Sequence, residues 1–260
     1  MRYTSVSLFT LITLLSACGR PGAQTSPVAQ APAASNSVDS QGMPVQLTAE
    51  SFGDADENVV PTAPLAELAL EEAYFDAVAT VPGPAVFALP AFDTKWGMAR
   101  QVYDKAVAYM AAHADTFPNK RYVIVMDMNQ HASKRRVYVF DLVAGTVERH
   151  VGAHGKNSDP ANTGWAKYFS NHNGSLQSAL GVYKTLGSFY FARHGMSIRL
   201  QGLESTNSNA LARGILLHPA WYMSDRGGSG RSWGCVAMDP AITDMLVNHA
   251  KGGAMLVIWK

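Results

Sequence analysis

The sequence has almost no excess of one charge over the other, and it has few cysteines. Charged residues make up 16% of the 260 residues, the 21 Lys and Arg nearly balance the 20 Asp and Glu, and there are 2 cysteines. No basic run interleaved with aromatic residues occurs, so we expect no binding to nucleic acid. The Cys-x-x-Cys and His-Glu-x-x-His spacings, a P-loop and a Gly-x-Gly-x-x-Gly segment after a strand are missing as well. We therefore expect neither a metal site nor a cofactor.

The apolar run nearest the N-terminus, Leu8–Leu15, is too short to cross a bilayer as a helix and has the length of a signal-peptide core. It ends in Leu15-Ser-Ala-Cys18, which resembles the lipobox of bacterial lipoproteins. We predict a lipoprotein signal peptide over residues 1–18, with Cys18 as the lipidation site and the membrane as a partner through this lipid anchor. An ordinary secretory signal with an incidental cysteine is the alternative. Since Gly19 is not the aspartate that retains lipoproteins at the inner membrane, we expect a periplasmic protein anchored to the outer membrane.

Composition divides the rest of the chain into three parts. Residues 19–61 are rich in Ala, Pro, Ser, Gln and Gly, which is typical of a flexible tether. In residues 62–118 the apolar side chains follow helical spacing, and we predict one helix from about residue 64 and a second over about 94–112. We expect this helical segment to pack on a domain formed by residues 119–260.

From Arg121 onwards the apolar period changes from helical spacing to two, which predicts strands. The predicted strands cover residues 122–126, 136–140, 145–151, 181–186, 197–200, 214–217 and 255–259. Asp239 and Pro240 form a helix N-cap and first position, and the helix they begin runs to about Ala250. A long Gly- and Asn-rich loop surrounds residues 159–174, and loops of that length are often functional. These elements predict a mainly β, α+β fold.

One histidine and one cysteine stand out as candidate catalytic residues. His218 follows the apolar run Gly214-Ile-Leu-Leu, and Cys235 follows Gly234 beyond a Gly- and Arg-rich loop. A thiolate is a strong nucleophile, and an imidazole can deprotonate a thiol and stabilise the resulting ion pair. If Cys18 is acylated, Cys235 is the remaining thiol in an oxidising compartment, where a structural thiol is uncommon. The pattern predicts cysteine-dependent acyl transfer, with a buried structural cysteine as the alternative.

This part of the chain resembles the L,D-transpeptidase (YkuD-like) family, whose signature is a histidine, a loop and then Ser/Thr-His-Gly-Cys. His218, Ser232, Gly234 and Cys235 match that signature, whereas Trp233 replaces its second histidine. The departure points to a divergent branch, the murein L,D-transpeptidase catalytic domain proteins. The resemblance covers roughly residues 120–260. Its further matching segments are residues 155–158, 169–171, 174–181, 199–204 and 213–215.

The resemblance implies a β-sandwich or partly open barrel that acts on peptidoglycan stem peptides. His218 would deprotonate Cys235, and the thiolate would attack the amide carbonyl that follows diaminopimelate, with release of D-alanine. The backbone N–H groups of Gly234 and Cys235 are the expected oxyanion donors. Asp225, Glu204 or a backbone carbonyl could orient His218, whereas His154, His172 and His194 are expected to be surface residues. The side chains offered for substrate binding are Ser232, Arg231, Trp233, Tyr183, Arg199 and Asn171.

Several alternatives stay open at this stage. Arg231 could lower the pKa of the thiol, bind a substrate carboxylate or be a solvated loop residue, and core packing is the stronger interpretation of Tyr183. The acceptor of the acyl group could be a peptidoglycan amine, a protein lysine or water. The resemblance also implies acylation of Cys235 by carbapenem β-lactams. The rival function is a non-catalytic lipoprotein that binds murein and tethers the outer membrane to it.

Overall fold

The structure is a computed structural model that describes residues 86–191, 194–226 and 229–260. The predicted signal peptide with Cys18, the tether and the helix from residue 64 lie outside these residues. Within the described part of the chain, no helix combines the length and the apolar character that crossing a bilayer requires.

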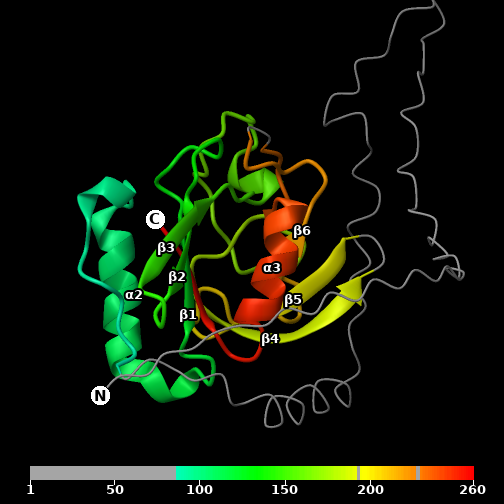
Figure 1. Cartoon of the computed structure of the whole chain (residues 1–260). Coiled ribbons are helices and arrows are strands. Elements are labelled where there is room, and N and C mark those ends of the chain that lie inside the picture. The colour runs from blue at the N-terminus through cyan, green and yellow to red at the C-terminus, as the bar shows by residue number, and fades with distance from the viewer. Residues whose placement is uncertain (1–85, 192–193, 227–228) are drawn as a thin grey trace, which may run out of the picture. The chain divides into compact units, whose positions relative to one another are not determined.

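The strands form one continuous sheet of eight strands in the order β3-β2-β1-β8-β4-β5-β6-β7. Figure 1 shows this sheet curving in a barrel-like way between two helices, which confirms the predicted mainly β fold. The strand bounds are β1 Tyr122–Asp127, β2 Val137–Asp141, β3 Thr146–His150, β4 Gly181–Phe191, β5 Gly195–Gly202, β6 Leu216–Pro219, β7 Val236–Met238 and β8 Met255–Trp259. The first three strands form a meander, because β1 pairs with β2 and β2 with β3, both antiparallel.

The alternation of side chains along the strands builds a separate hydrophobic cluster on each face of the sheet. In β1, Ile124 and Met126 face one cluster, and Val123 and Val125 face the other. Successive side chains of a strand point to opposite faces, so a strand buried on both sides is apolar throughout. This explains why β1 and β8 read as continuous apolar runs. They lie side by side in parallel at the middle of the sheet.

The helix α2, Arg100–His113, covers one face of the sheet. Its buried side chains share a cluster with β1, β2, β4 and β8; they are Val102, Tyr103, Ala106 and Met110. The helix predicted over residues 94–112 is therefore only partly correct. A separate 3₁₀ turn, η2 (Thr94–Trp96), precedes α2, and it ends at Gly97, whose φ of 73° lies in the left-handed region. Gly97 stops the first turn because left-handed backbone cannot continue a right-handed helix.

The helix α3, Pro240–Ala250, covers the other face and packs against β5 and β6. The Asp239 carboxylate accepts the Ala241 N–H at 3.0 Å, which confirms the predicted N-cap. Leu246, Val247 and Ala250 enter the same cluster as Leu217 of β6 and Val236 of β7. The helix thus packs against β6, which carries His218, and shares a hydrophobic cluster with β7, which begins directly after Cys235.

The predicted long loop is present between β3 and β4 and contains one 3₁₀ turn, η4 (Lys156–Ser158). A single bridge joins Gly155 to Ser232, and the Lys156 N–H donates to the Ser232 carbonyl at 2.7 Å. The loop is thereby fastened to the segment just before Cys235.

Candidate active site

The register of two neighbouring strands brings Cys235 and His218 together. Strands β6 and β7 are parallel, and His218 pairs with Ala237, two residues after Cys235. Cys235 lies directly before β7, and its sulfur contacts the backbone N–H of Leu216, two residues before His218. The pairing of β6 with β7 therefore brings the two predicted catalytic residues into neighbouring segments at one edge of the sheet.

His218 is held by the backbone rather than by a carboxylate. Its side chain is buried, and its Nδ1 lies 2.9 Å from the Pro219 carbonyl oxygen. A carbonyl oxygen only accepts hydrogen bonds, so Nδ1 carries the proton and Nε2 keeps its lone pair. The sequence left three candidates for the group that orients His218, and the structure shows that it is a backbone carbonyl.

The two carboxylates considered as partners of His218 lie elsewhere, which corrects that expectation. Asp225 contacts the His150 Nδ1 at 2.7 Å and accepts the Val151 N–H at 2.8 Å, so it ties the loop after β6 to β3. Glu204 forms an ion pair with Lys105 of α2 and accepts a backbone N–H of β4 at 2.8 Å. Both carboxylates hold the fold together away from the imidazole.

The environment of His218 keeps the imidazole neutral. Burial, and to a lesser degree the neighbouring His194, lower the pKa of His218 to about 3. The ring centroids of His194 and His218 are 4.3 Å apart. His194 was expected to be a surface residue, and nothing in its local sequence signals this contact. His218 is accordingly a neutral base, and the predicted thiolate–imidazolium ion pair is not favoured before substrate arrives.

The thiol of Cys235 lies against the backbone that leads into β6. Its Sγ accepts the Leu216 N–H at 3.4 Å and donates to the Gly214 carbonyl at 3.7 Å. A partly buried sulfur between one donor and one acceptor can keep its proton, and it retains the N–H donor once the proton leaves. The Leu216 N–H is thus placed to stabilise a thiolate.

The residues before Cys235 give the motif its shape. Gly234 has a φ of 127°, and a Cβ placed on it would lie 2.8 Å from the Gln177 carbonyl oxygen, so only glycine fits. The hydroxyl of Ser232 donates to the Cys235 carbonyl at 2.8 Å and accepts the Gly234 N–H at 3.1 Å. This corrects one expected oxyanion donor, because the Gly234 N–H is used within the motif. The Cys235 N–H stays a predicted donor.

Three of the side chains predicted to bind substrate instead support the site. Ser232 and Tyr183 are fully buried, and the Tyr183 hydroxyl donates to the Ala179 carbonyl at 2.8 Å within the core. Asn171 binds the loop that follows β5, donating to the Ser205 carbonyl at 3.0 Å. Arg199 is on β5, paired with Leu216 of β6. For Arg199, as for Arg231 and Trp233, substrate contact stays a prediction.

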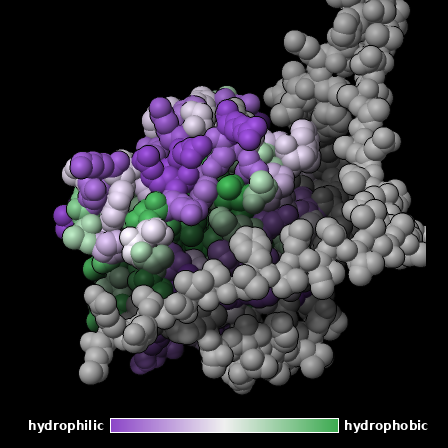
Figure 2. Space-filling view, viewed as in Figure 1, coloured by the Kyte–Doolittle hydropathy of each residue, from purple (hydrophilic) through white to green (hydrophobic). Residues whose placement is uncertain are grey.

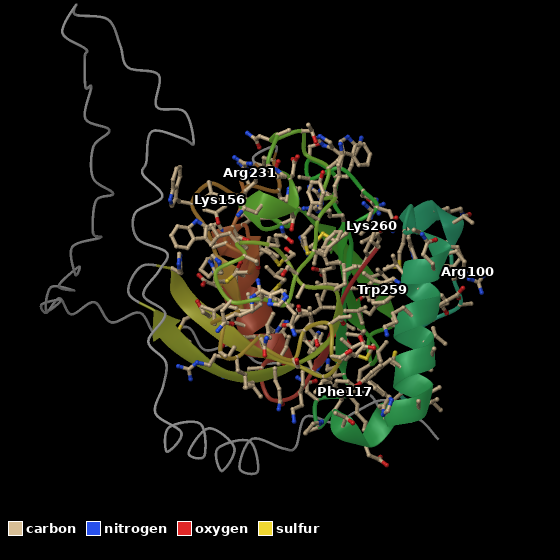
Figure 3. The ribbon with its side chains drawn as sticks, turned by 180° about the vertical axis from the view of Figure 1, so that it is seen from behind. Arg100, Phe117, Lys156, Arg231, Trp259 and Lys260 are labelled. Atoms are coloured by element: carbon tan, nitrogen blue, oxygen red, sulfur yellow. The ribbon has the colours of Figure 1, made fainter. Side chains whose placement is uncertain are left out.

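The loops around the motif place two cations at one end of the molecule. The Arg231 Nη1 donates to the Asp159 carbonyl at 2.8 Å and approaches the Lys156 carbonyl at 3.4 Å. The Lys156 ammonium lies 5.4 Å from the centre of the Trp233 ring, a cation–π distance. Figure 3 shows Arg231 and Lys156 together at this end, distant from Phe117. The surface around η4, at the top of Figure 2, is hydrophilic.

Two further histidines of the loop region differ in their surroundings. His172 is exposed, as expected, whereas His154 is fully buried with its Nδ1 at 2.8 Å from an Arg136 nitrogen. Burial, and to a lesser degree the Arg136 charge, lower the pKa of His154 to about 4. Among the described residues, no three His, Cys, Asp or Glu side chains are grouped so that they could hold a metal ion.

Comparison with known proteins places the chain in a family. The family model of the L,D-transpeptidase catalytic domain matches residues 94–259. No curated protein matches the chain. A solved L,D-transpeptidase from Mycobacterium smegmatis is 12% identical with a TM-score of 0.36, and the match covers 54% of this chain and 59% of that one.

Two other solved structures show a similar degree of likeness. Bd1075 from Bdellovibrio bacteriovorus is 15% identical with a TM-score of 0.34, over 54% of this chain and 48% of that one. The L,D-transpeptidase LdtMt1 in complex with imipenem is 10% identical with a TM-score of 0.32, over 54% and 59%. In each case the match spans less than two thirds of the neighbour's length. The family match includes α2, both strands of the site and the Cys235 motif, and the chain belongs to the L,D-transpeptidase catalytic domain family.

Proposed function

We propose that this protein is a cysteine-dependent peptidoglycan L,D-transpeptidase. The observation that carries the proposal is that the Cys235 thiol contacts β6 at the Leu216 N–H, two residues before His218. The His218 Nδ1 proton is held by the Pro219 carbonyl, which leaves Nε2 available as a base. Membership of the L,D-transpeptidase family supports the same activity. Stem peptides of peptidoglycan are the proposed substrate, and we propose no cofactor.

The proposed reaction proceeds in two halves around a thioester. His218 accepts the thiol proton as the Cys235 sulfur attacks the carbonyl carbon between diaminopimelate and D-alanine. The C–N bond breaks, the imidazolium returns the proton to the leaving amine, and D-alanine departs. An amine or water, deprotonated by His218, then attacks the thioester and frees the thiolate. A neutral base suits both halves, since an imidazole that is already protonated cannot accept the proton.

Incubation with muropeptides tests the activity directly. A soluble form lacking residues 1–18 is mixed with tetrapeptide muropeptides, and products are read by mass spectrometry. Release of D-alanine is expected, together with cross-linked or trimmed products that identify the acceptor. The Cys235→Ala protein serves as the matched control. Turnover by Cys235→Ala at the unmodified rate, or no thioester adduct on Cys235, would contradict the proposal.

A non-catalytic murein-binding tether remains the second candidate, because Trp233 replaces the second histidine of the family motif. Exposure to a carbapenem separates the two functions. An active nucleophile is acylated on Cys235, and His218→Ala slows that acylation. A Cys235 that stays unmodified while the protein still sediments with purified murein would favour the tether.

We also propose that the protein is a periplasmic lipoprotein, anchored through Cys18 and sorted to the outer membrane. The proposal is supported by the short apolar run and the Leu15-Ser-Ala-Cys18 segment. Labelled palmitate should enter the unmodified protein and not the Cys18→Ala protein. Equal labelling of both proteins would rule out Cys18 as the acylated residue.

A further inference from the structure

Arg213 is a partly buried cation beside the nucleophile that sequence analysis did not single out as a site residue. It immediately precedes Gly214, at the entrance to β6. Its Nη1 donates to the Ser170 carbonyl at 2.7 Å, and its Nη2 donates to the Gln177 carbonyl at 2.5 Å and the Ser175 hydroxyl at 3.2 Å. The guanidinium thus binds three residues near the end of the long loop between β3 and β4.

All three of these acceptors are neutral. In the described part of the chain, no ion pair between a carboxylate and Arg213 is formed. A partly buried guanidinium keeps its proton, and a charge removed from water is stabilised by a nearby anion. A nearby anion would therefore stabilise the Arg213 charge, and no carboxylate among the described residues provides one.

The candidate anion is the sulfur of Cys235. The Arg213 Nη2 lies 3.2 Å from the position that a Gly234 side chain would occupy, so the guanidinium packs directly on the residue before Cys235. The sulfur in turn contacts Gly214 and Leu216, which follow Arg213 in the chain. Although burial lowers the pKa of Arg213, the proximity of Tyr183 and Cys235 raises it, so the two groups are coupled electrostatically.

Within the part of the chain that the structure describes, the other charged or titratable groups on the elements around the motif are neutral or contact other partners. The groups on the surrounding elements are His218 on β6, His194 against His218, Tyr183 on β4 and Arg231 in the preceding loop. His218 is neutral in its buried position, as argued above. Tyr183 has its pKa raised by burial and is also neutral. The Arg231 guanidinium donates to the Asp159 carbonyl and approaches the Lys156 carbonyl.

We propose that Arg213 is a positioning residue whose fixed positive charge stabilises the Cys235 thiolate and whose planar contacts hold residues 170–177 against the motif. Proton transfer to a neutral His218 is then favourable because the negative charge left on sulfur is met by a cation already in place. The importance of this effect for turnover rests on the proposed function. The stabilisation of the thiolate is a property of the protein alone and can be measured without substrate.

The test is the pH dependence of alkylation of Cys235 by iodoacetamide in the full chain, read peptide by peptide by mass spectrometry so that Cys18 does not interfere. Only the thiolate reacts, and each unit rise of the thiol pKa lowers the rate about tenfold below that pKa. We expect Arg213→Gln to move the midpoint upward and to slow alkylation at pH 7 about tenfold or more. Arg213→Lys, which keeps the charge, should restore most of the rate. Arg149→Gln, at an exposed arginine of β3, is the matched control.

The two variants separate charge from structure. A midpoint in Arg213→Gln equal to that of the unmodified protein would overturn the proposal. If Arg213→Gln does not fold, Arg213→Lys decides alone, because a midpoint raised in this variant would mean that the contacts matter and the charge does not. Failure of the proposed function looks different, since muropeptides would then remain unprocessed while the alkylation midpoint still shifted with Arg213.

Discussion

At the scale of single residues, the site depends on groups whose usual chemistry is altered by burial. His218 and Arg213 share the surroundings of Cys235, and burial acts on them in different ways. The imidazole loses its charge, whereas the guanidinium keeps its own because its intrinsic pKa is so high. The segments around the thiol therefore carry one neutral base and one permanent cation.

Gly234 offers the sharpest steric prediction. Alanine at this position would meet the Gln177 carbonyl at 2.8 Å and the Arg213 guanidinium at 3.2 Å, in a strained backbone conformation. We expect Gly234→Ala to abolish acylation of Cys235 by a carbapenem and to lower stability by about 1–3 kcal/mol. Gly174→Ala is the control, because Gly174 also has a positive φ, of 73°, but has nothing within 4 Å of a Cβ. Acylation of Gly234→Ala at the control's rate would show that the motif tolerates a side chain.

The buried histidines predict how stability changes with pH. The pKa is lowered from 6.5 to about 3 for His218 and to about 4 for His154, so between these values the unfolded chain binds protons that the folded chain does not. Stability is therefore complete above about pH 6.5 and is lost as the pH falls toward 4, with a slope of up to about 1.4 kcal/mol per pH unit for each group.

Urea unfolding between pH 4 and pH 8 measures this slope. His154→Gln, which cannot take up the proton, should unfold with a shallower dependence on pH than the unmodified protein. The exposed His172 provides the comparison, and His172→Gln should leave the slope unchanged. An unfolding free energy that is flat across this range would contradict the burial argument.

At the scale of secondary-structure elements, local patterns predicted most strands and the cap of α3, but not the features set by distant partners. Strand β1 and helix α3 follow from apolar periodicity and from the Asp239-Pro240 pair. The three-residue β7 carries too little periodicity to be seen, and it forms because β6 offers it a parallel partner. Strand β4 extends beyond the predicted residue 186 through a register shift between Thr185 and Ser188.

The same distinction applies to the site. Cys235 and His218 were predicted because each lies in a recognisable local segment, and the pairing of β6 with β7 then brings these segments side by side. His194 and Arg213 were missed as site residues because their importance comes from contacts with residues remote in the sequence. Asp225 was considered as a partner of His218 on chemical type alone, and the fold uses it at His150.

The cap of α3 is expected to matter beyond the helix. The Asp239 carboxylate accepts the Ala241 N–H at 3.0 Å and also the Asp225 N–H at 2.9 Å. We expect Asp239→Ala to lower the free energy of unfolding by about 1–2 kcal/mol, since an N-cap is lost and a second backbone donor is left without its acceptor. Chemical denaturation measures the change. Asp244→Ala, at an exposed position of the same helix, should change stability little, and equal losses in both variants would argue against the cap.

At the scale of the whole molecule, the sheet needs a cover on each face. Helix α3 covers the face behind the site, whereas α2 covers the opposite face through its own cluster. The family match also begins at residue 94 and includes α2. Figure 2 shows hydrophobic residues at the surface on the α2 side of the molecule, in contrast to the hydrophilic end near η4. We therefore regard α2 as part of the folding unit that carries the site.

This view predicts that α2 supports the stability of the domain from a distance. Met110 is 2% exposed and packs in the cluster shared with β1 and β8, so Met110→Ala should cost about 2–5 kcal/mol. Val107 on the same helix is 37% exposed, and Val107→Ala should change stability by about 0.5 kcal/mol or less. Thermal unfolding followed by circular dichroism, together with carbapenem acylation of Cys235, measures both effects. A core shared by α2 and the sheet requires one cooperative transition. If Met110→Ala loses helical circular dichroism while the rest of the domain unfolds at its usual temperature, α2 is not part of the folding unit.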